Sequence, residues 1–279
     1  MPDTLDLNGK VAVITGSGKE TGIGACIAST LARNGALVTI NYVSDASAPR
    51  AARVAEKIRE QGGRATVVQA DVSTAKGSKE LIKRTLDAFE VDKIDIIGEY
   101  SYVFQMKRSL YKYAHRSVNN AAGGAPHGAL QATRDSLDTI FSTIVYAPIF
   151  LLQAAVPHMP HGSRIINIGS IASKLGMAST AIYGAAKAAQ DSLTYSLAME
   201  LGRSHGITVN TVSPGPVGTE ALPKDVGAKI DRMLVPMTRA EERLGTTNDI
   251  ADAVLLLVSE KSRWITGQVI SVSGGITGG

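Results

Sequence analysis

The sequence predicts an α/β protein in which one doubly wound parallel sheet of seven strands carries helices on both faces. Short apolar runs rich in Val and Ile alternate with longer segments of helical period, as buried parallel strands alternate with their crossover helices. A glycine-rich turn follows the first apolar run. The 279 residues, 44% of them apolar and 19% charged, have the composition of a globular chain, and we expect a single domain over residues 1–279.

The strands and helices follow in order along the chain. Residues 11–15 form the first expected strand, and residues 22–34 form a helix whose Ile23, Ile27 and Leu31 lie four apart on one face. The same alternation places later strands at 37–42, 65–70, 93–97, 164–168, 208–212 and 268–272, and helices at 48–61, 76–89, 183–202 and 247–259, with another helix ending near residue 158.

Charge and cysteine content argue against a nucleic-acid or membrane partner, a disulfide and a metal site. The net charge is only +4 despite a pI near 9.1, so neither nucleic acid nor a membrane is expected as a partner. Cys26 is the single cysteine, and His158 and His161 lie in a proline-broken stretch without a nearby carboxylate, so we expect no disulfide and no metal site. The N-terminus is polar and no run approaches the roughly 18 apolar residues of a membrane span. We therefore expect a cytosolic protein.

The turn after the first strand has the composition of a phosphate-binding loop. Residues 15–24 read TGSGKETGIG. Glycines in such a turn let backbone N–H groups and a helix N-terminus approach a pyrophosphate. The alternative is a strand-to-helix turn without a ligand, but its position after the first strand of an alternating chain favours a dinucleotide.

The end of the second strand favours NADPH over NADH. Asn41 occupies the place where an acidic residue would bind an unphosphorylated ribose. Asn41, Tyr42 and Ser44, with Lys19 from the glycine loop, are the residues expected around a 2′-phosphate. Ordinary loop polarity is the alternative interpretation of these residues.

A phenol, an ammonium and a hydroxyl form the candidate catalytic group. Tyr183 and Lys187 are four residues apart on one face of a helix. Free tyrosine has a pKa of about 10, and a nearby positive charge favours its phenolate. Ser170 follows the strand at 164–168, at the sheet edge where doubly wound folds bind ligands, and its hydroxyl can hold a substrate carbonyl.

These motifs together resemble the short-chain dehydrogenase/reductase (SDR) family of single-domain Rossmann-fold enzymes. The family's glycine loop, its Asp-Val pair, its Asn-Asn-Ala turn, its Ser, Tyr and Lys, and its Pro-Gly stretch all occur here in order. The resemblance is greatest to NADPH-dependent ketoreductases, including 3-oxoacyl carrier-protein reductases and polyhydroxynaphthalene reductases of secondary metabolism. It implies a homotetramer acting on a small-molecule ketone.

The resemblance also implies roles for single residues. Tyr183 is the expected general acid, Ser170 orients the carbonyl, and Lys187 binds the nicotinamide ribose and lowers the pKa of Tyr183. Val217 and Thr219 are expected to hold the carboxamide. The full expected cofactor-binding set is Gly16, Lys19, Gly22, Ile23, Gly24, Asn41, Tyr42, Ser44, Asp71, Val72, Asn120, Ala121, Tyr183, Lys187, Pro214, Gly215, Val217 and Thr219.

Two departures from the family concern the glycine loop and the proton relay. The loop between Gly16 and Gly22 is longer than the family's usual loop, so it should bulge and its phosphate contacts should shift. Ile144 aligns with an Asn that many relatives carry, and Ile has no amide with which to fix the helix kink or hold a relay water. The alternative function is therefore an SDR scaffold that binds the cofactor but has lost or changed its redox chemistry.

A third departure is an atypical insertion at residues 98–117, rich in aromatic and basic side chains. Without it, residues 93–97 would join Val118 in an uninterrupted family strand. We interpret it as a retained intron translated in frame, because its end residues permit codons that contain a donor and an acceptor splice site. The alternative is a basic aromatic lid or a docking surface for an acidic carrier protein. In the folded chain, the insertion should loop out of the sheet or displace the turn at Asn119 and Asn120.

Overall fold

The expected seven-stranded parallel sheet is confirmed in the computed structural model, which describes residues 5–99, 128–219 and 224–278. The strand order is β3-β2-β1-β4-β5-β6-β7, and every neighbouring pair is parallel. The strands are β1 (Val11–Ile14), β2 (Leu37–Tyr42), β3 (Arg64–Gln69), β4 (Ile96–Glu99), β5 (Arg164–Ile168), β6 (Thr208–Pro214) and β7 (Val269–Val272).

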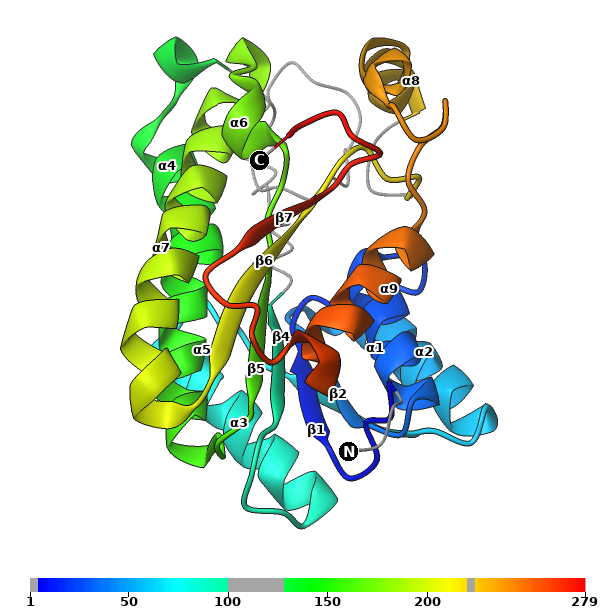
Figure 1. The fold of residues 1–279 in the computed structure, drawn as a ribbon, viewed down its shortest axis with the longest axis vertical. Helices are drawn as coiled ribbons and strands as arrows, with labels where there is room; N and C mark the ends of the chain where they lie inside the picture. Colours follow the sequence, from blue (N-terminus) through cyan, green and yellow to red (C-terminus); the bar gives the residue numbers. More distant parts are fainter. Residues whose placement is uncertain (1–4, 100–127, 220–223, 279) are drawn as a thin grey trace.

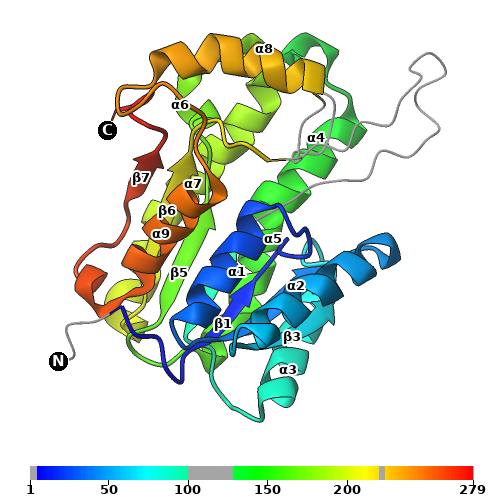
Figure 2. The ribbon, with the colours of Figure 1, turned by 90° about the vertical axis from the view of Figure 1, so that its right-hand side faces the viewer.

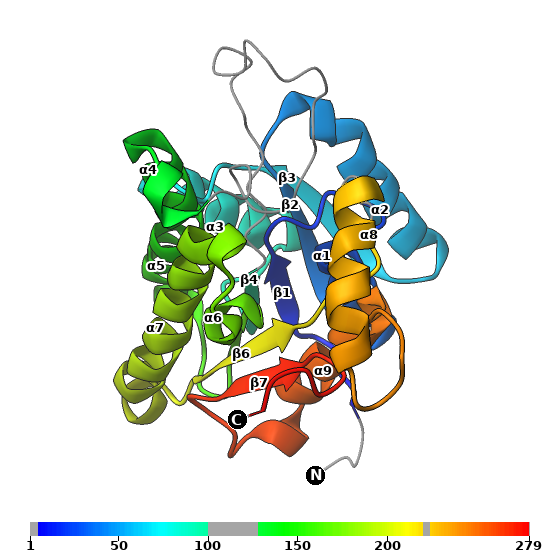
Figure 3. The same cartoon turned by 90° about the horizontal axis from the view of Figure 1, so that it is seen from above.

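Helices cover both faces of this sheet (Figure 1). On one face lie α1 (Ile23–Arg33), α2 (Ala48–Glu60) and α9 (Thr247–Val258). On the other lie α3 (Ala75–Phe89), α4 (Arg134–Phe141), α5 (Ala147–Ala155) and α7 (Ala181–His205), a division that Figure 3 shows from above. The short α6 (Ala172–Leu175) packs on α7, and α8 (Lys224–Leu234) lies across the end of the molecule at which the parallel strands finish (Figure 2).

The apolar runs form these strands because both faces of the sheet are buried. Alternate residues of β1 enter different cores: Ile14 packs with α1 and α9, whereas Val13 packs with α3 and α5. The chain reverses direction across the sheet between β1 and β4, which are neighbours although β2 and β3 come between them in sequence. In doubly wound sheets the ligand binds at the carboxyl ends of the strands beside this switch point.

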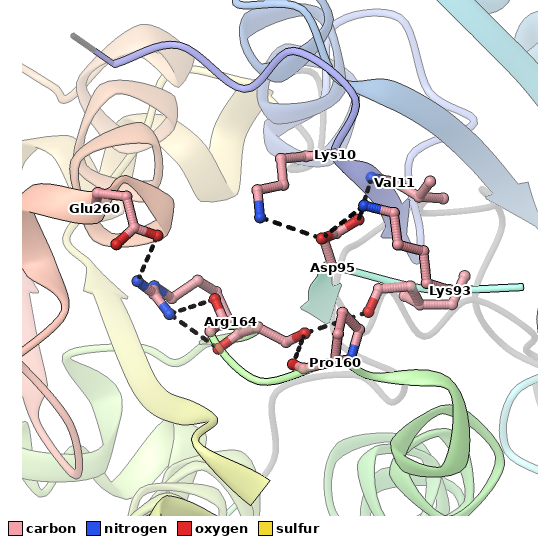
Figure 4. A network of polar contacts seen from close by, with 10 residues as sticks. Lys10, Val11, Lys93, Asp95, Pro160, Arg164 and Glu260 are labelled. Carbon is pink, nitrogen blue, oxygen red and sulfur yellow. Dashed lines mark hydrogen bonds and ion pairs between the residues drawn. The ribbon is translucent and has the colours of Figure 1, made fainter. Parts of the chain in front are cut away.

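At the opposite end of the strands, where β1 and β4 begin, a buried carboxylate holds the chain in place (Figure 4). Asp95 is 2% exposed, and its Oδ2 accepts a hydrogen bond of 3.0 Å from the backbone N–H of Val11. Lys10 Nζ and Lys93 Nζ each lie 3.2 Å from this carboxylate. Asp95 therefore joins the start of β1 to the residues that lead into β4.

The helical segment between β4 and β5 contains an irregular turn. Residues Ser142–Tyr146 are π-helical and lie between α4 and α5. By length and composition alone, the segment Arg134–His158 could cross a membrane, because its most apolar 18 residues have a mean hydropathy of 1.8; no stretch of this kind was expected from the sequence. Apolar side chains of this segment belong to the protein core, because Leu151 and Ala155 are fully buried against α3.

Strand boundaries agree with the sequence pattern to within two residues except at β4, and the helix expected at 183–202 is longer, α7 extending to His205. The expected strand at 93–97 is shifted to Ile96–Glu99, where Gly98 pairs with Ile166 and Glu99 with Asn167 of β5. The first two residues of the insertion extend the ladder, whereas the expectation that the insertion loops out or displaces the turn at Asn119 and Asn120 concerns residues outside those described. Residues 100–117 lie outside the described residues.

Candidate active site

The glycine loop is tied to the neighbouring strand by Ser17. The Ser17 hydroxyl donates to the Ile14 carbonyl at 2.6 Å and accepts from the Asn41 N–H at 3.0 Å. Gly16 has a φ of +57°, which favours glycine. A Cβ on Gly24 would lie 2.9 Å from the Gly16 carbonyl oxygen, so glycine at this position lets α1 approach the loop closely.

The N-terminus of α1 is suited to an anion. The helix begins after Gly22, no side chain caps its first turn, and that turn contains no acidic residue. Backbone N–H groups at such an end can bind phosphate. Ile23 is buried beneath the loop, and Lys19 is half-buried beside it. These residues fit the pyrophosphate of a dinucleotide.

Asn41 occupies a different environment from the one expected. Its side chain is 1% exposed, and its amide nitrogen donates to the carbonyls of Ala70 at 3.0 Å and Val68 at 3.3 Å. The amide therefore joins β2 to the end of β3, which corrects the expectation that it reaches a 2′-phosphate. Tyr42 and Ser44 are half-buried, and Ser44 Oγ lies 2.9 Å from Ser47 Oγ.

Two arginines beside the glycine loop were missed by the sequence analysis. Arg53 Nε donates to Glu20 Oε1 at 2.7 Å, and Arg50 Nε lies 3.7 Å from Glu20 Oε2. Glu20 belongs to the lengthened part of the loop, and both arginines belong to α2. Their spacing of three residues near the start of α2 was the signal available, because it places both guanidinium groups on one face of that helix.

The other expected cofactor residues lie at the ends of β3 and β6. Asp71 is exposed, and its Oδ1 accepts from the backbone and hydroxyl of Ser73, while Val72 is buried. Asn120 and Ala121 lie outside the described residues.

The stretch after β6 runs close to the last strand. Gly215 N donates to the Val272 carbonyl at 3.1 Å, and Val217 pairs with Gly245. Pro214 is the last residue of β6, and Thr219 is half-buried.

Ser170 and Tyr183 are brought together as expected. The Ser170 hydroxyl lies near enough to the Tyr183 phenol to affect its ionisation, and both residues are half-buried. Gly184 permits this contact, because a Cβ there would lie 2.6 Å from the Ala172 carbonyl and would separate α6 from α7. Burial raises the pKa of the Tyr183 phenol, whereas the neighbouring Ser170 hydroxyl lowers it. The net shift is upward, opposite to the direction expected from Lys187 alone, because desolvation dominates.

Lys187 lies one helical turn beyond Tyr183 and is 4% exposed. Its Nζ donates to the Ile168 carbonyl at 2.6 Å and to Gln190 Oε1 at 3.0 Å. Burial lowers the pKa of Lys187 to about 8, although the charges of Glu99 and Asp191 act in the opposite direction. The ammonium is therefore held at the carboxyl end of β5, two residues before Ser170.

Ile144, aligned with the relay Asn, is fully buried in the π-helical turn. It packs in a small cluster with Ile140 and Ala186, against which Tyr183 also lies. The helix is therefore irregular here without a side-chain amide, so an Asn is not needed for the distortion. Among the described residues, no group of three or more His, Cys, Asp or Glu side chains could hold a metal.

The fold and this constellation define an oxidoreductase of the nicotinamide-dependent type. A family profile described as "Enoyl-(Acyl carrier protein) reductase" matches residues 16–101 and 98–277. The chain belongs to the short-chain dehydrogenase/reductase family.

Individual relatives cover nearly the whole chain. The short-chain dehydrogenase/reductase FrzI of Cladobotryum sp is 37% identical over 281 residues, covering 99% of this chain and 97% of FrzI. A short chain dehydrogenase of Burkholderia cenocepacia solved with NADP has a TM-score of 0.80 and 34% identity, and the match covers 97% of this chain and 98% of that one. The angucycline C-6 ketoreductase LanV with bound NADP has a TM-score of 0.81 and 31% identity, over 97% of this chain and 96% of LanV.

Proposed function

We propose that this chain catalyses the NADPH-dependent reduction of a ketone, or the reverse oxidation of an alcohol, on an acyl-type or secondary-metabolite substrate. The observation that carries the proposal is the placement of Ser170, Tyr183 and Lys187 together at the carboxyl ends of the strands, with Lys187 held against the end of β5. The similar structure of the angucycline C-6 ketoreductase LanV, solved with bound NADP, supports the cofactor and the substrate class.

In this mechanism the protein supplies the proton. The nicotinamide, when bound, supplies a hydride to the carbonyl carbon. The Ser170 hydroxyl holds the carbonyl oxygen beside Tyr183, and the phenolic O–H bond breaks as the O–H bond of the alcohol forms. The phenolate then recovers a proton from solvent. A raised pKa suits this donor, because the phenol is protonated at neutral pH before the transfer.

Lys187 acts through its charge and its remaining donor. An ammonium group has three N–H donors, and two of them are directed to the Ile168 carbonyl and to Gln190. We assign the third to the ribose of the cofactor. The positive charge, one helical turn from Tyr183, stabilises the phenolate that forms during proton transfer.

The preference for NADPH rests on the residues around the glycine loop. The second strand has no acidic residue at its end, and Lys19, Tyr42 and Ser44 are the residues expected around a 2′-phosphate. Arg50 and Arg53 lie on the same side of the loop and both pair with Glu20, so these three side chains together carry one net positive charge. We expect kcat/KM for NADPH to exceed that for NADH, and equal values would contradict this assignment.

The test of the reaction is NADPH oxidation by the purified chain, followed at the absorbance band of NADPH with aromatic polyketide ketones and 3-oxoacyl thioesters. Tyr183→Phe should lower kcat by about 10²- to 10⁴-fold, the usual contribution of general acid catalysis. Its NADPH affinity, measured from cofactor fluorescence, should stay close to the wild-type value. Turnover that is unchanged in Tyr183→Phe would overturn the assignment of the acid.

The second candidate function is an SDR scaffold that binds NADPH without redox turnover. The observation in its favour is Ile144, which places an apolar side chain where many relatives carry a relay amide. The two functions differ in one measurement: a scaffold would change the NADPH fluorescence but oxidise no cofactor with any ketone of the panel.

We also propose that the chain forms a homotetramer, as the family resemblance implies. Helix α7 exposes Tyr195 and Met199, at 64% and 75%, on adjacent turns. Apolar side chains grouped in this way favour a protein contact. Light scattering coupled to gel filtration should give about four times the chain mass of 29.2 kDa, and a single-chain mass would contradict the proposal.

A further inference from the structure

Strand β4 ends in a buried carboxylate that the reaction described above does not use. Glu99 is 1% exposed and pairs with Asn167 in the middle of the sheet. A buried ionised carboxylate is costly unless a positive charge or hydrogen bonds compensate it. Glu99 stands at the carboxyl edge, on the strand next to the one that leads to Ser170.

A chain of hydrogen bonds joins Glu99 to Lys187. Gln190 Nε2 donates to Glu99 Oε2 at 2.9 Å, and Gln190 Oε1 accepts from Lys187 Nζ at 3.0 Å. Gln190 is fully buried, so both ends of its amide are satisfied within the protein. The amide can present its oxygen to the ammonium because its nitrogen is directed to the carboxylate.

The backbone of α7 is fixed independently of this chain. Asn167 Nδ2 donates to Thr194 Oγ1 at 2.8 Å, and Thr194 Oγ1 lies 2.8 Å from Thr211 Oγ1. These contacts join α7 to β5 and β6 one turn beyond Gln190. Loss of the Glu99 carboxylate should therefore change the state of the Lys187 side chain more than the position of its helix.

The charges that face Lys187 come from three elements. Glu99 belongs to β4, Asp191 and Tyr183 belong to α7, and Lys174 of α6 acts on Asp191. Glu99 is the more deeply buried of the two carboxylates, since Asp191 is only half-buried. An opposite charge acts more strongly in a desolvated site than in a solvated one.

We propose that Glu99 is a positioning residue: through Gln190 it holds the Lys187 side chain against the end of β5 and keeps it an ammonium. Its importance for catalysis rests on the proposed function, whereas the contacts themselves do not. In the chain as given, the first two residues of the insertion complete β4, and Glu99 stands where the uninterrupted sequence would place Asn119.

The test is the titration of Lys187 in the complete chain without substrate. Lysines are labelled with carbon-13 at the ε position, and the Lys187 signal is assigned by its loss in Lys187→Met. Glu99→Gln, which removes the charge and keeps a similar shape, should lower the midpoint of the Lys187 titration by about one pH unit or more. Asp95→Asn is the matched control, because it removes a buried carboxylate from the residues that lead into the same strand, at its opposite end.

Each outcome decides the inference. A lower midpoint in Glu99→Gln but not in Asp95→Asn supports it, and the alkaline limb of ketone reduction should then move by the same amount. An unchanged midpoint in Glu99→Gln overturns it. Should Glu99→Gln fail to fold, Glu99→Asp keeps the charge but withdraws it by one methylene, and a smaller shift in the same direction is expected. No shift in Glu99→Asp would then overturn the inference.

The same data separate this inference from the proposed function. A wild-type chain that reduces ketones through Tyr183, but whose Lys187 midpoint does not depend on Glu99, would overturn only the positioning role. A chain that shows the Lys187 shift but oxidises no NADPH would keep the positioning role and overturn the proposed reaction.

Discussion

The ionisation of Lys187 should set the alkaline limb of ketone reduction. Burial holds its pKa at about 8, well below the ordinary lysine value of 10.5. Because the pKa of Tyr183 is raised and that of Lys187 is lowered, Lys187 is the first of these two groups to lose its proton as the pH rises. At about one unit above its pKa only about a tenth of the lysine remains charged, so kcat/KM should fall roughly tenfold between pH 7 and 9.

The measurement is kcat/KM for NADPH, because this constant reports groups of the free enzyme, which is the state that the structure describes. Lys187→Arg is the control variant, since a guanidinium keeps its charge above pH 12. Its rate should be lower throughout, but it should not fall between pH 7 and 10. A wild-type profile that is flat over this range would refute the reasoning, and so would an identical limb in Lys187→Arg.

Three further predictions concern the loop, the opposite sheet edge and the transcript. Gly24→Ala places a Cβ against the backbone of Gly16, so the NADPH dissociation constant from fluorescence titration should rise at least about tenfold. Gly202→Ala, which meets no atom within 4 Å, should leave the constant unchanged. Asp95→Asn weakens two ion pairs and the bond to Val11, so chemical denaturation should show a loss of about 1–3 kcal/mol, and no loss would contradict that accounting. The retained-intron interpretation predicts that sequencing the mature transcript will find messages lacking codons 98–117, and their absence would exclude it.

Most of the fold could be predicted because buried parallel strands are continuous apolar runs. Six strands lie within two residues of the expected boundaries at each end. The start of β4 could not be predicted in this way, since the apolar pattern at 93–97 includes Asp95, whose burial depends on Lys10 and Lys93. The strand is completed by Gly98 and Glu99, and neither residue type indicates a strand.

The positions of site residues could be predicted where a motif fixes the backbone. The hydrogen-bond partners of their side chains could not, where several partners are possible. Ser170 and Tyr183 meet because α6 packs on α7, and the small residue at Gly184 signals that contact. The orientation of Asn41 was not predictable, because its amide bonds to carbonyls at the end of β3 that only the folded sheet brings near. The Glu99–Gln190 bond joins residues far apart in sequence, and neither belongs to a recognisable motif.

The π-helical turn at Ser142–Tyr146 explains how one continuous segment can pack against two different helices of the same layer. One extra residue in a turn rotates everything after it by about 100° about the axis, compared with an uninterrupted α-helix. The first half, α4, is thereby turned toward α7, while the second half, α5, is turned toward α3. A change in the length of that turn would rotate the apolar face of α5 away from α3. Deleting a single residue there should therefore lower the stability of the fold far more than replacing one.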